Sequence, residues 1–349
     1  MNTMRCFQGD REMEQGIKWK RDKYSLLLIG LLILLSGLII VWKMPQKEDR
    51  YIHVGIAVYD QSDTFMESYI GELEDKIGRM KILGKKVSYE IYDAEGIGSR
   101  QEKQLQEMYA QDYDVMLVNL VEPASAASVL NDAKDADIPV ILFNREIDEK
   151  DLKISKDVWY VGTDARAAGV MQGELLKDLW LKQSQTLDWN GNGMLDYILV
   201  EGEESHFDAI RRTSGFLEAG AELPLNQKGN ILAEWKRELA YEKFGALDET
   251  TVQNVEAVIC NNDDMALGVY DYYKEKNLKL PVIIGINNSE EMHQKIMAGE
   301  VYGTVDNKME DQAAEICRLM QAILKKHTES YQKVWYSTPW AIIKTEEKN

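Results

Sequence analysis

The sequence is poor in cysteine and in positive charge, and each scarcity excludes a class of protein. Only 3 cysteines occur among the 349 residues, and an odd, sparse set of this kind provides no disulfide framework. Cys260 and Cys317 stand in a strand-like apolar pattern and a helical pattern, so we expect both to be buried free thiols. The formal net charge is -18, and a surface this acidic repels nucleic-acid phosphates and anionic lipid headgroups. We therefore expect no nucleic-acid partner.

The sequence also lacks the motifs of several enzyme classes. It contains no G-x-S-x-G nucleophile motif, no H-E-x-x-H zinc motif and no Walker-type G-x-x-x-x-G-K loop. A glycosidase, which uses a pair of carboxylates, is a remote alternative with Asp63 and Asp208 as the candidate pair. We therefore expect a protein that is not an enzyme.

A long apolar run near the N-terminus predicts a membrane anchor. Residues 25–42 contain no charged side chain, and their length is close to the ~20 residues that span a bilayer as a helix. Basic residues at 18–23 precede the run, which places residues 1–24 in the cytoplasm and the bulk of the chain outside the cell membrane. A cleaved signal peptide is the alternative, but the run ends without an A-x-A-like site. Residues 43–50 then form a short polar linker.

From residue 51 onward, short apolar runs alternate with amphipathic stretches. The runs are rich in Val and Ile, as is typical of strands that are buried on both faces of a parallel sheet. Strands are expected at 51–59, 87–93, 114–120, 138–143, 158–162, 196–202, 256–260, 280–286 and 301–305. Helices are expected between them, for example at 66–82, 101–111, 123–136, 165–181, 264–276 and 309–326. This alternation predicts a doubly wound α/β fold, and about 290 residues favour two lobes over a single core.

Polar side chains collect directly after these expected strands. Ligands of such sheets bind beyond the carboxyl ends of the strands, so these positions are candidates for a binding site: Asp63, Asn119, His206, Asp208, Asn262, Asn287 and Asn307. Each also has a structural explanation, because Asp and His side chains cap helices and asparagines are common in turns. Phe65 fits a helix core, Trp235 fits surface packing, and Arg212 fits a surface ion pair.

One loop has the spacing of a calcium site. Residues 188–196 read DWNGNGMLD, with oxygen-bearing side chains at Asp188, Asn190, Asn192 and Asp196. This spacing matches the first half of an EF-hand loop, in which Gly193 permits the sharp turn and the carbonyl of Met194 supplies a further oxygen. The usual glutamate at the twelfth position is missing, so the last carboxylate has to come from elsewhere in the chain. A polar turn without metal is the alternative.

Several segments of the exterior part keep a distinctive order and spacing. They are VGIAVYDQSDTFM, VNLVEPASA, YVGTDARAAGVMQGE, DWNGNGMLDYILVEGEESHFDAIRR, EAVICNNDDMALG and YGTVDN. Together they resemble the bacterial periplasmic glucose/galactose-binding proteins, which have the type I periplasmic-binding-protein fold. The resemblance extends from Tyr51 to about Lys325 and is weak after that point.

The resemblance implies two lobes that are joined by three crossing segments, with a sugar in the cleft between them. It assigns 51–143 with 308–335 to the N-terminal lobe and 144–307 with 336–349 to the C-terminal lobe. It also supplies the missing calcium carboxylate, which maps to Glu256.

A set of sugar-binding residues follows from the same resemblance. They are Asp63, Phe65, Asn119, His206, Asp208, Arg212, Trp235, Asn262, Asn287 and Asn307. The family has Asp where this chain has Asn287, which removes one anionic acceptor from the expected site. Aromatic side chains cover the C–H faces of a pyranose, and polar side chains bind its hydroxyl rim.

The function that the resemblance implies is delivery of a monosaccharide of the D-galactose or D-glucose type to an ABC transporter by closure of the cleft. A sensor that signals to a membrane histidine kinase or chemoreceptor is the alternative, and the expected membrane tether suits both functions. A sugar-responsive transcriptional repressor would share the lobes. It would also need an N-terminal helix-turn-helix and a basic face, and the apolar run occupies that place.

Overall fold

The computed structural model describes residues 51–344. The expected cytoplasmic segment, anchor and linker lie outside these residues, as does Cys6. Within residues 51–344, no helix combines the length and the apolar character that crossing a membrane requires. The anchor therefore stays a prediction from the sequence.

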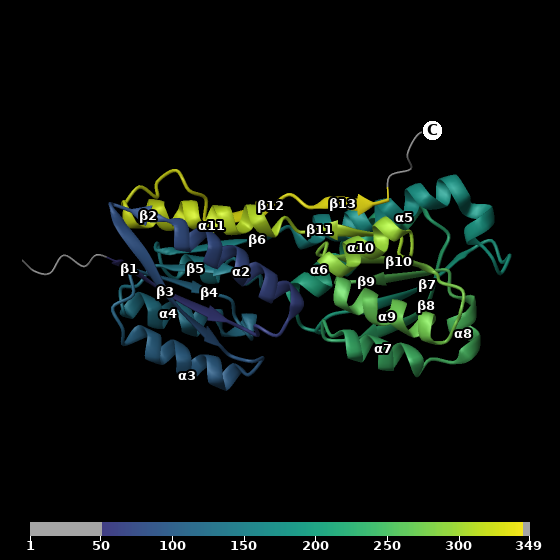
Figure 1. Ribbon diagram of the computed structural model, residues 1–349, viewed down its shortest axis with the longest axis horizontal. Coiled ribbons are helices and arrows are strands. Elements are labelled where there is room, and N and C mark those ends of the chain that lie inside the picture. The colour runs from purple at the N-terminus through teal and green to yellow at the C-terminus, as the bar shows by residue number, and fades with distance from the viewer. Residues whose placement is uncertain (1–50, 345–349) are drawn as a thin grey trace, which may run out of the picture. The chain divides into compact units, whose positions relative to one another are not determined.

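The first lobe is built on a seven-stranded sheet with helices on both faces (Figure 1). Its order is β12-β6-β5-β4-β1-β3-β2, and all neighbours are parallel except β2 and β3. The strands are β1 (Tyr51–Val58), β2 (Lys81–Ile82), β3 (Lys85–Asp93), β4 (Val115–Val118), β5 (Val140–Phe143), β6 (Val158–Thr163) and β12 (Val334–Ser337). One face packs against α2 (Thr64–Arg79) and α11 (Met309–Leu324), and the other against α3 (Gly98–Tyr109) and α4 (Ala126–Asp135). Short 3-10 helices lie at η1 (Pro123–Ser125) and η2 (Asp151–Lys153).

The second lobe repeats this arrangement on a six-stranded sheet of order β13-β11-β10-β9-β7-β8. Only β13 is antiparallel to its neighbour. The strands are β7 (Leu195–Glu201), β8 (Leu225–Leu232), β9 (Ala257–Cys260), β10 (Val282–Ile286), β11 (Gly303–Asp306) and β13 (Trp340–Ile343). One face packs against α5 (Ala165–Leu187) and α6 (Phe207–Ala219), and the other against α7 (Arg237–Gly245), α8 (Glu249–Asn254), α9 (Asp263–Glu275) and α10 (Glu290–Ala298). The 3-10 helix η3 (Gly220–Glu222) follows α6.

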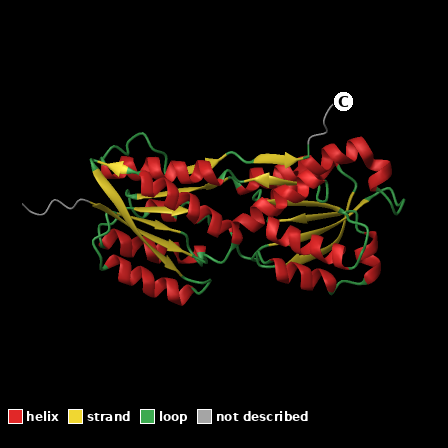
Figure 2. Ribbon diagram, viewed as in Figure 1, coloured by secondary structure: helices red, strands yellow, loops and turns green. Residues whose placement is uncertain are grey.

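The predicted α/β fold with two doubly wound lobes is confirmed. Figure 2 shows the strands of each lobe enclosed between helices. The chain passes between the two sheets after β6, after β11 and after β12. The expected free thiols are also present, because Cys260 and Cys317 are both buried and unpaired.

The structure differs from the expected lobe boundaries in two places, because residues 336–337 also belong to the first lobe as the end of β12. Residues 144–163 were expected in the second lobe, but β6 pairs with β5 and β12 in the first sheet. The polar stretch after Phe143 is only a connection within that lobe, because the apolar run of β6 completes its sheet before the chain crosses. Four strands were not predicted from the sequence: β2, β8, β12 and β13. All four lie at the edges of their sheets, where one neighbouring strand is missing and the apolar pattern is weak.

Helices α5 and α6 pack with their backbones in direct contact. A Cβ atom added at Gly169 would lie 1.9 Å from the carbonyl oxygen of Arg212, and one added at Gly215 would lie 2.2 Å from that of Arg166. Only glycine permits this approach. The contact fixes the position of α6, whose N-terminal end lies at the interface between the lobes.

Gly169→Ala should lower the free energy of unfolding by about 1–3 kcal/mol, the usual cost of overpacking a well-packed contact. Chemical denaturation measures this change. Gly71→Ala is the matched control, because Gly71 also lies in a helix but an added Cβ atom has nothing within 4 Å. That variant should gain roughly 0.5–1 kcal/mol from the reduced entropy of the unfolded chain. A Gly169→Ala variant as stable as the parent would contradict the close packing.

Candidate functional site

A small pocket lies between the two lobes. Its cavity volume is about 40 Å³, which leaves room for a few water molecules. The first lobe contributes Tyr59, Asp63, Phe65, Met66, Asn144 and Arg145, and the second contributes His206, Asp208, Arg212, Trp235, Asn262 and Asn287. Both lobes therefore supply polar and aromatic groups to one pocket.

Eight of the ten residues that were expected in the site line this pocket. The other two lie directly behind the lining. Asn119 donates from Nδ2 to the carbonyl of Phe143 at 3.1 Å and to Oδ1 of Asn144 at 3.2 Å. Asn307 donates from Nδ2 to Oδ1 of Asn287 at 2.8 Å. Each of the two thus orients an asparagine that does line the pocket.

The N-terminus of α6 presents a neutral histidine to the pocket. Nδ1 of His206 accepts a hydrogen bond from the backbone N–H of Asp208 at 3.2 Å, which places the ring proton on Nε2. Burial, with the Arg145 and Arg212 guanidinium groups nearby, lowers the pKa of His206 to about 2. The contact of 3.8 Å between Nδ1 and Asp208 is therefore no ion pair. The expected capping role holds, and Nε2 is left as a buried donor without a protein partner.

Asp208 and Arg212 stand one helical turn apart on α6 and are both buried. Burial raises the pKa of Asp208 to about 6, although Arg212 acts in the opposite direction. Nη1 of Arg212 donates to the carbonyl of Asn261 at 2.5 Å. Oδ1 of Asp208 and Nε of Arg212 have no partner in the protein. The structural alternative for Arg212, a surface ion pair, is therefore wrong, because the residue is only 6% exposed.

Trp235 forms one wall of the pocket from an unusual backbone position. Its φ is 66°, and its indole ring lies so close to Gly202 that an added Cβ atom would be 2.2 Å away. The ring meets His206 edge-on at 5.3 Å between centroids, and the guanidinium of Arg212 lies 5.5 Å from its centre. Asn262 holds the loop by donating to the carbonyl of Trp235 at 2.9 Å. Nε1 of Trp235 is a further buried donor without a partner.

The opposite wall comes from the end of β1 and the start of α2. Asp63 caps α2 by accepting from the backbone N–H of Met66 at 2.9 Å, and burial raises its pKa. Phe65 packs on Tyr69 at 5.8 Å between ring centroids. Phe65 is thus partly a core residue, as the structural explanation held, and it also faces the pocket.

The sequence analysis missed Tyr59, Met66, Asn144 and Arg145. Arg145 lies over the ring of Tyr59 at 3.9 Å and donates to the carbonyl of Val121 at 2.6 Å. It also pairs with Glu203 of the second lobe at 2.7 Å. Asn144 and Arg145 directly follow β5, so the rule that sites form at the carboxyl ends of strands would have found them.

The loop expected to bind calcium is tightly hydrogen-bonded. Asp188 accepts from the backbone N–H groups of Asn192 at 3.0 Å and Gly193 at 2.8 Å. Oδ1 of Asn192 accepts from the N–H of Met194 at 2.7 Å. Gly191 and Gly193 have φ values of 70° and 78°. The loop is therefore held in a turn by its own side chains.

Glu256 reaches this loop from the start of β9. Its carboxylate accepts from the N–H of Asn190 at 3.3 Å and of Asp196 at 3.0 Å. Burial raises the pKa of Glu256, and the carboxylates of Asp188 and Asp196 raise it further. The amide nitrogens of Asn190 and Asn192 both donate to Asp196, at 3.1 and 3.3 Å. Across residues 51–344, no three His, Cys, Asp or Glu side chains are arranged to hold a metal, so calcium stays a prediction.

Comparisons with known proteins agree with the fold. The periplasmic binding protein domain matches residues 54–328. The chain is 31% identical over 277 residues to the D-galactose/methyl-galactoside binding periplasmic protein of Haemophilus influenzae, covering 76% of this chain and 80% of that protein. It is 26% identical over 241 residues to the galactofuranose-binding protein of Escherichia coli, covering 67% and 71%.

Solved structures show the same architecture. A periplasmic solute-binding protein of an ABC transporter from Actinobacillus succinogenes, with bound D-allose, has a TM-score of 0.72 at 18% identity and covers 84% of this chain and 97% of its own. The fructose-binding periplasmic domain of a hybrid two-component system has a TM-score of 0.69 at 19% identity, with coverage of 84% and 91%. The sequence match and the two-lobed fold together show that this chain belongs to the periplasmic binding protein family.

Proposed function

We propose that this chain is an extracytoplasmic receptor that closes its two lobes around one monosaccharide of the D-galactose or D-glucose type and delivers it to an ABC transporter. The observation that carries the proposal is a set of buried polar atoms without protein partners at the pocket. They are Nε2 of His206, Oδ1 of Asp208, Nε of Arg212 and Nε1 of Trp235. Burying such groups unpaired costs about 1–3 kcal/mol each, which a ligand with several hydroxyl groups would recover.

The chemistry of these atoms fits a sugar better than other small ligands. The pocket carries both donors and an acceptor without protein partners, and each hydroxyl group of a sugar both donates and accepts. The rings of Trp235 and Phe65 provide apolar surface for the C–H faces of a pyranose. The 31% identical relative that carries galactose in its name supports the choice of hexose.

Calorimetry with glucose, galactose, xylose and ribose tests the proposal. We expect heat and saturable binding with at least one of the two hexoses, accompanied by a change in Trp235 fluorescence. Trp235→Ala should weaken binding about 30-fold, the factor that corresponds to ~2 kcal/mol for a buried aromatic contact.

Trp340→Ala is the matched control, because Trp340 is 61% exposed and lies outside the pocket. It should bind as the parent does. Absence of binding for both hexoses would remove the assignment, and a Trp235→Ala variant with the affinity of the parent would remove the stacking role.

Binding should depend on pH through Asp208. In the empty pocket the pKa of Asp208 is about 6, and a carboxylate accepts hydrogen bonds from hydroxyl groups better than a carboxylic acid does. Ligand binding should therefore favour the ionised form, so affinity should be full above pH 7 and should fall as the pH drops through 6. Titration calorimetry between pH 5 and 8 measures this change.

Other carboxyl groups titrate in the same range, because burial also raises the pKa of Asp263 to about 7 and that of Asp264 to about 6. The Asp208→Asn variant separates them from Asp208. It should bind more weakly and with little dependence on pH, whereas an undiminished pH dependence would assign the effect to another group.

We further propose that the loop at residues 188–196 binds calcium with Glu256 as the remote carboxylate. The two glycines already hold the loop in its turn, and rotation of the amides of Asn190 and Asn192 would present oxygen in place of nitrogen. Hard oxygen ligands of this number suit Ca²⁺. The metal would have a structural role, since the loop joins α5 to β7 and lies away from the pocket residues.

Removal of calcium should lower the melting temperature of the exterior part. A metal at 100 times its Kd stabilises the folded state by about 2.7 kcal/mol, so a chelator should produce a clear shift in a thermal melt. The Glu256→Gln variant should melt at one temperature with and without chelator. If the parent melts identically in both conditions, the loop does not use calcium.

A sensor that reports to a membrane histidine kinase or chemoreceptor would use the same cleft closure, and the fold likeness to a two-component system domain is compatible with it. Crosslinking in native membranes separates the two functions. Recovery of a permease supports transport, and recovery of a kinase or chemoreceptor supports sensing.

A further inference from the structure

The crossings between the lobes meet at one backbone carbonyl. The carbonyl oxygen of Asn307 accepts from Oγ1 of Thr163 at 2.9 Å, from Oγ of Ser337 at 2.7 Å and from Nε2 of Gln312 at 2.8 Å. Thr163 ends β6, Ser337 ends β12, and Asn307 follows β11, so each crossing contributes one residue. All four residues are buried. The hinge therefore has a hydrogen-bonded centre that excludes water.

The backbone carbonyl and the side chain of Asn307 form hydrogen bonds with different lobes. Its carbonyl is bound by groups of the first lobe, since Thr163 and Ser337 pair in the first sheet and Gln312 lies on α11. Its side chain donates to Asn287, which follows β10 of the second lobe and lines the pocket. Oδ1 of the same amide is buried and has no partner. Asn307 thus joins the centre of the hinge to the pocket.

The backbone on both sides of this connection is strained. Lys308 directly after Asn307 has a φ of 54°, and Asn287 has a φ of 136°. Positive φ values are costly for residues other than glycine and persist only where the surrounding contacts enforce them. The orientation of the two asparagine side chains therefore depends on the contacts that hold their backbones.

We propose that Gln312 is a positioning residue for ligand recognition: through the carbonyl of Asn307 it holds the Asn307 amide against Asn287 and so couples the hinge to the pocket. This inference rests on the proposed function, in which ligand binding favours the closed lobes. The hydrogen-bond partners of Gln312 are Thr163 and Asn307, and neither of them lines the pocket.

Of the three side chains that donate to the carbonyl of Asn307, Gln312 has the role that the two hydroxyl groups cannot take over. A hydroxyl group rotates freely, and the hydroxyl oxygens of Thr163 and Ser337 are 3.0 Å apart, so their hydrogens can be exchanged between acceptors. The amide of Gln312 is planar and donates both to Oγ1 of Thr163 at 2.7 Å and to the carbonyl of Asn307 at 2.8 Å. Its Oε1 has no partner. The two donated bonds alone therefore set the orientation of this amide.

Gln312→Met tests the proposal, because it keeps the length of the side chain and removes both donated bonds. We expect the affinity for the hexose to fall about 3- to 10-fold, the factor that corresponds to the loss of one net hydrogen bond. Gln104→Met is the matched control. Nε2 of Gln104 donates to the carbonyl of Asp93 at 2.8 Å and its Oε1 is also unpartnered, but both residues belong to the first lobe. That variant should keep the affinity of the parent.

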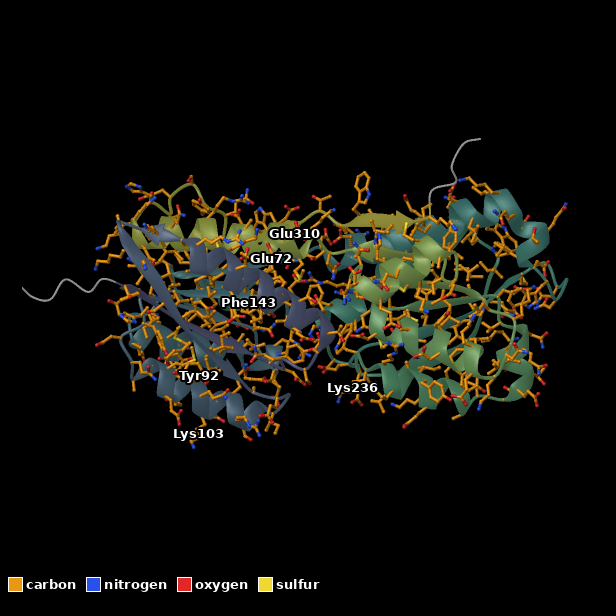
Figure 3. The ribbon with its side chains drawn as sticks, viewed as in Figure 1. Glu72, Tyr92, Lys103, Phe143, Lys236 and Glu310 are labelled. Carbon is orange, nitrogen blue, oxygen red and sulfur yellow. The ribbon has the colours of Figure 1, made fainter. Side chains whose placement is uncertain are left out.

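The distance between the lobes provides a readout that a loss of stability alone would not change. Spin labels at Lys103→Cys on α3 and Leu181→Cys on α5, in a Cys6→Ser background, report on opposite lobes, and both positions are exposed. Figure 3 shows Lys103 on the outer side of the first lobe. With saturating hexose, Gln312→Met should keep a larger open fraction than the parent or Gln104→Met.

A double-mutant cycle with Asn307→Ala decides whether Gln312 acts through the Asn307 side chain. Removal of that amide leaves the carbonyl in place, so Gln312→Met should cause no further loss of affinity in this background. An equal loss in both backgrounds would overturn the proposal, as would a Gln312→Met variant with the affinity and lobe distances of the parent. Gln312→Leu, which also removes both donated bonds, serves the same cycle if Gln312→Met does not fold. A parent that binds no hexose would refute the proposed function, whereas the lobe distances of the free protein would still test the hinge.

Discussion

Polar atoms that are buried between the lobes without protein partners are the constraint on which the site depends. His206, Asp208 and Trp235 each carry such an atom at the pocket. Folding alone does not satisfy these groups, since the remaining donors and acceptors nearby already serve helix ends and loops. In the proposed function, the hydroxyl groups of the ligand satisfy these atoms when the lobes close. In that proposal the same atoms serve both recognition and the coupling of recognition to closure.

The fold keeps these polar atoms without protein partners by fixing the backbone around them. The glycine contact between α5 and α6 leaves α6 no freedom to shift, so Asp208 and Arg212 keep their buried positions. Trp235 and Asn287 are held at positive φ values, and strain of this kind is commonly concentrated at functional sites. If the backbone could rearrange, the buried polar atoms would form hydrogen bonds within the protein and would no longer favour a ligand.

Several residues both stabilise local structure and line the pocket, although the two roles were set out as alternatives from the sequence. Asp63 and His206 cap helices, as their structural explanations held, and both still face the pocket. Capping uses one atom of each side chain, and the second ring nitrogen of His206, Nε2, has no protein partner. Asn119 was expected to line the pocket but instead orients Asn144 from behind, because its amide is already bonded to the first sheet. The alternatives were therefore not exclusive.

The sequence by itself determined the α/β class and the two lobes, because strand and helix patterns are local features, and its resemblance to a known family indicated most of the pocket lining. Tertiary structure decided that β6 belongs to the first sheet, that Arg145 reaches Glu203 across the cleft, and that Asn307 binds both lobes. These outcomes depend on which distant segments become neighbours when the chain crosses between the sheets. Burial and hydrogen bonding of such pairs arise only when the lobes are assembled, so no pattern within a single segment encodes them.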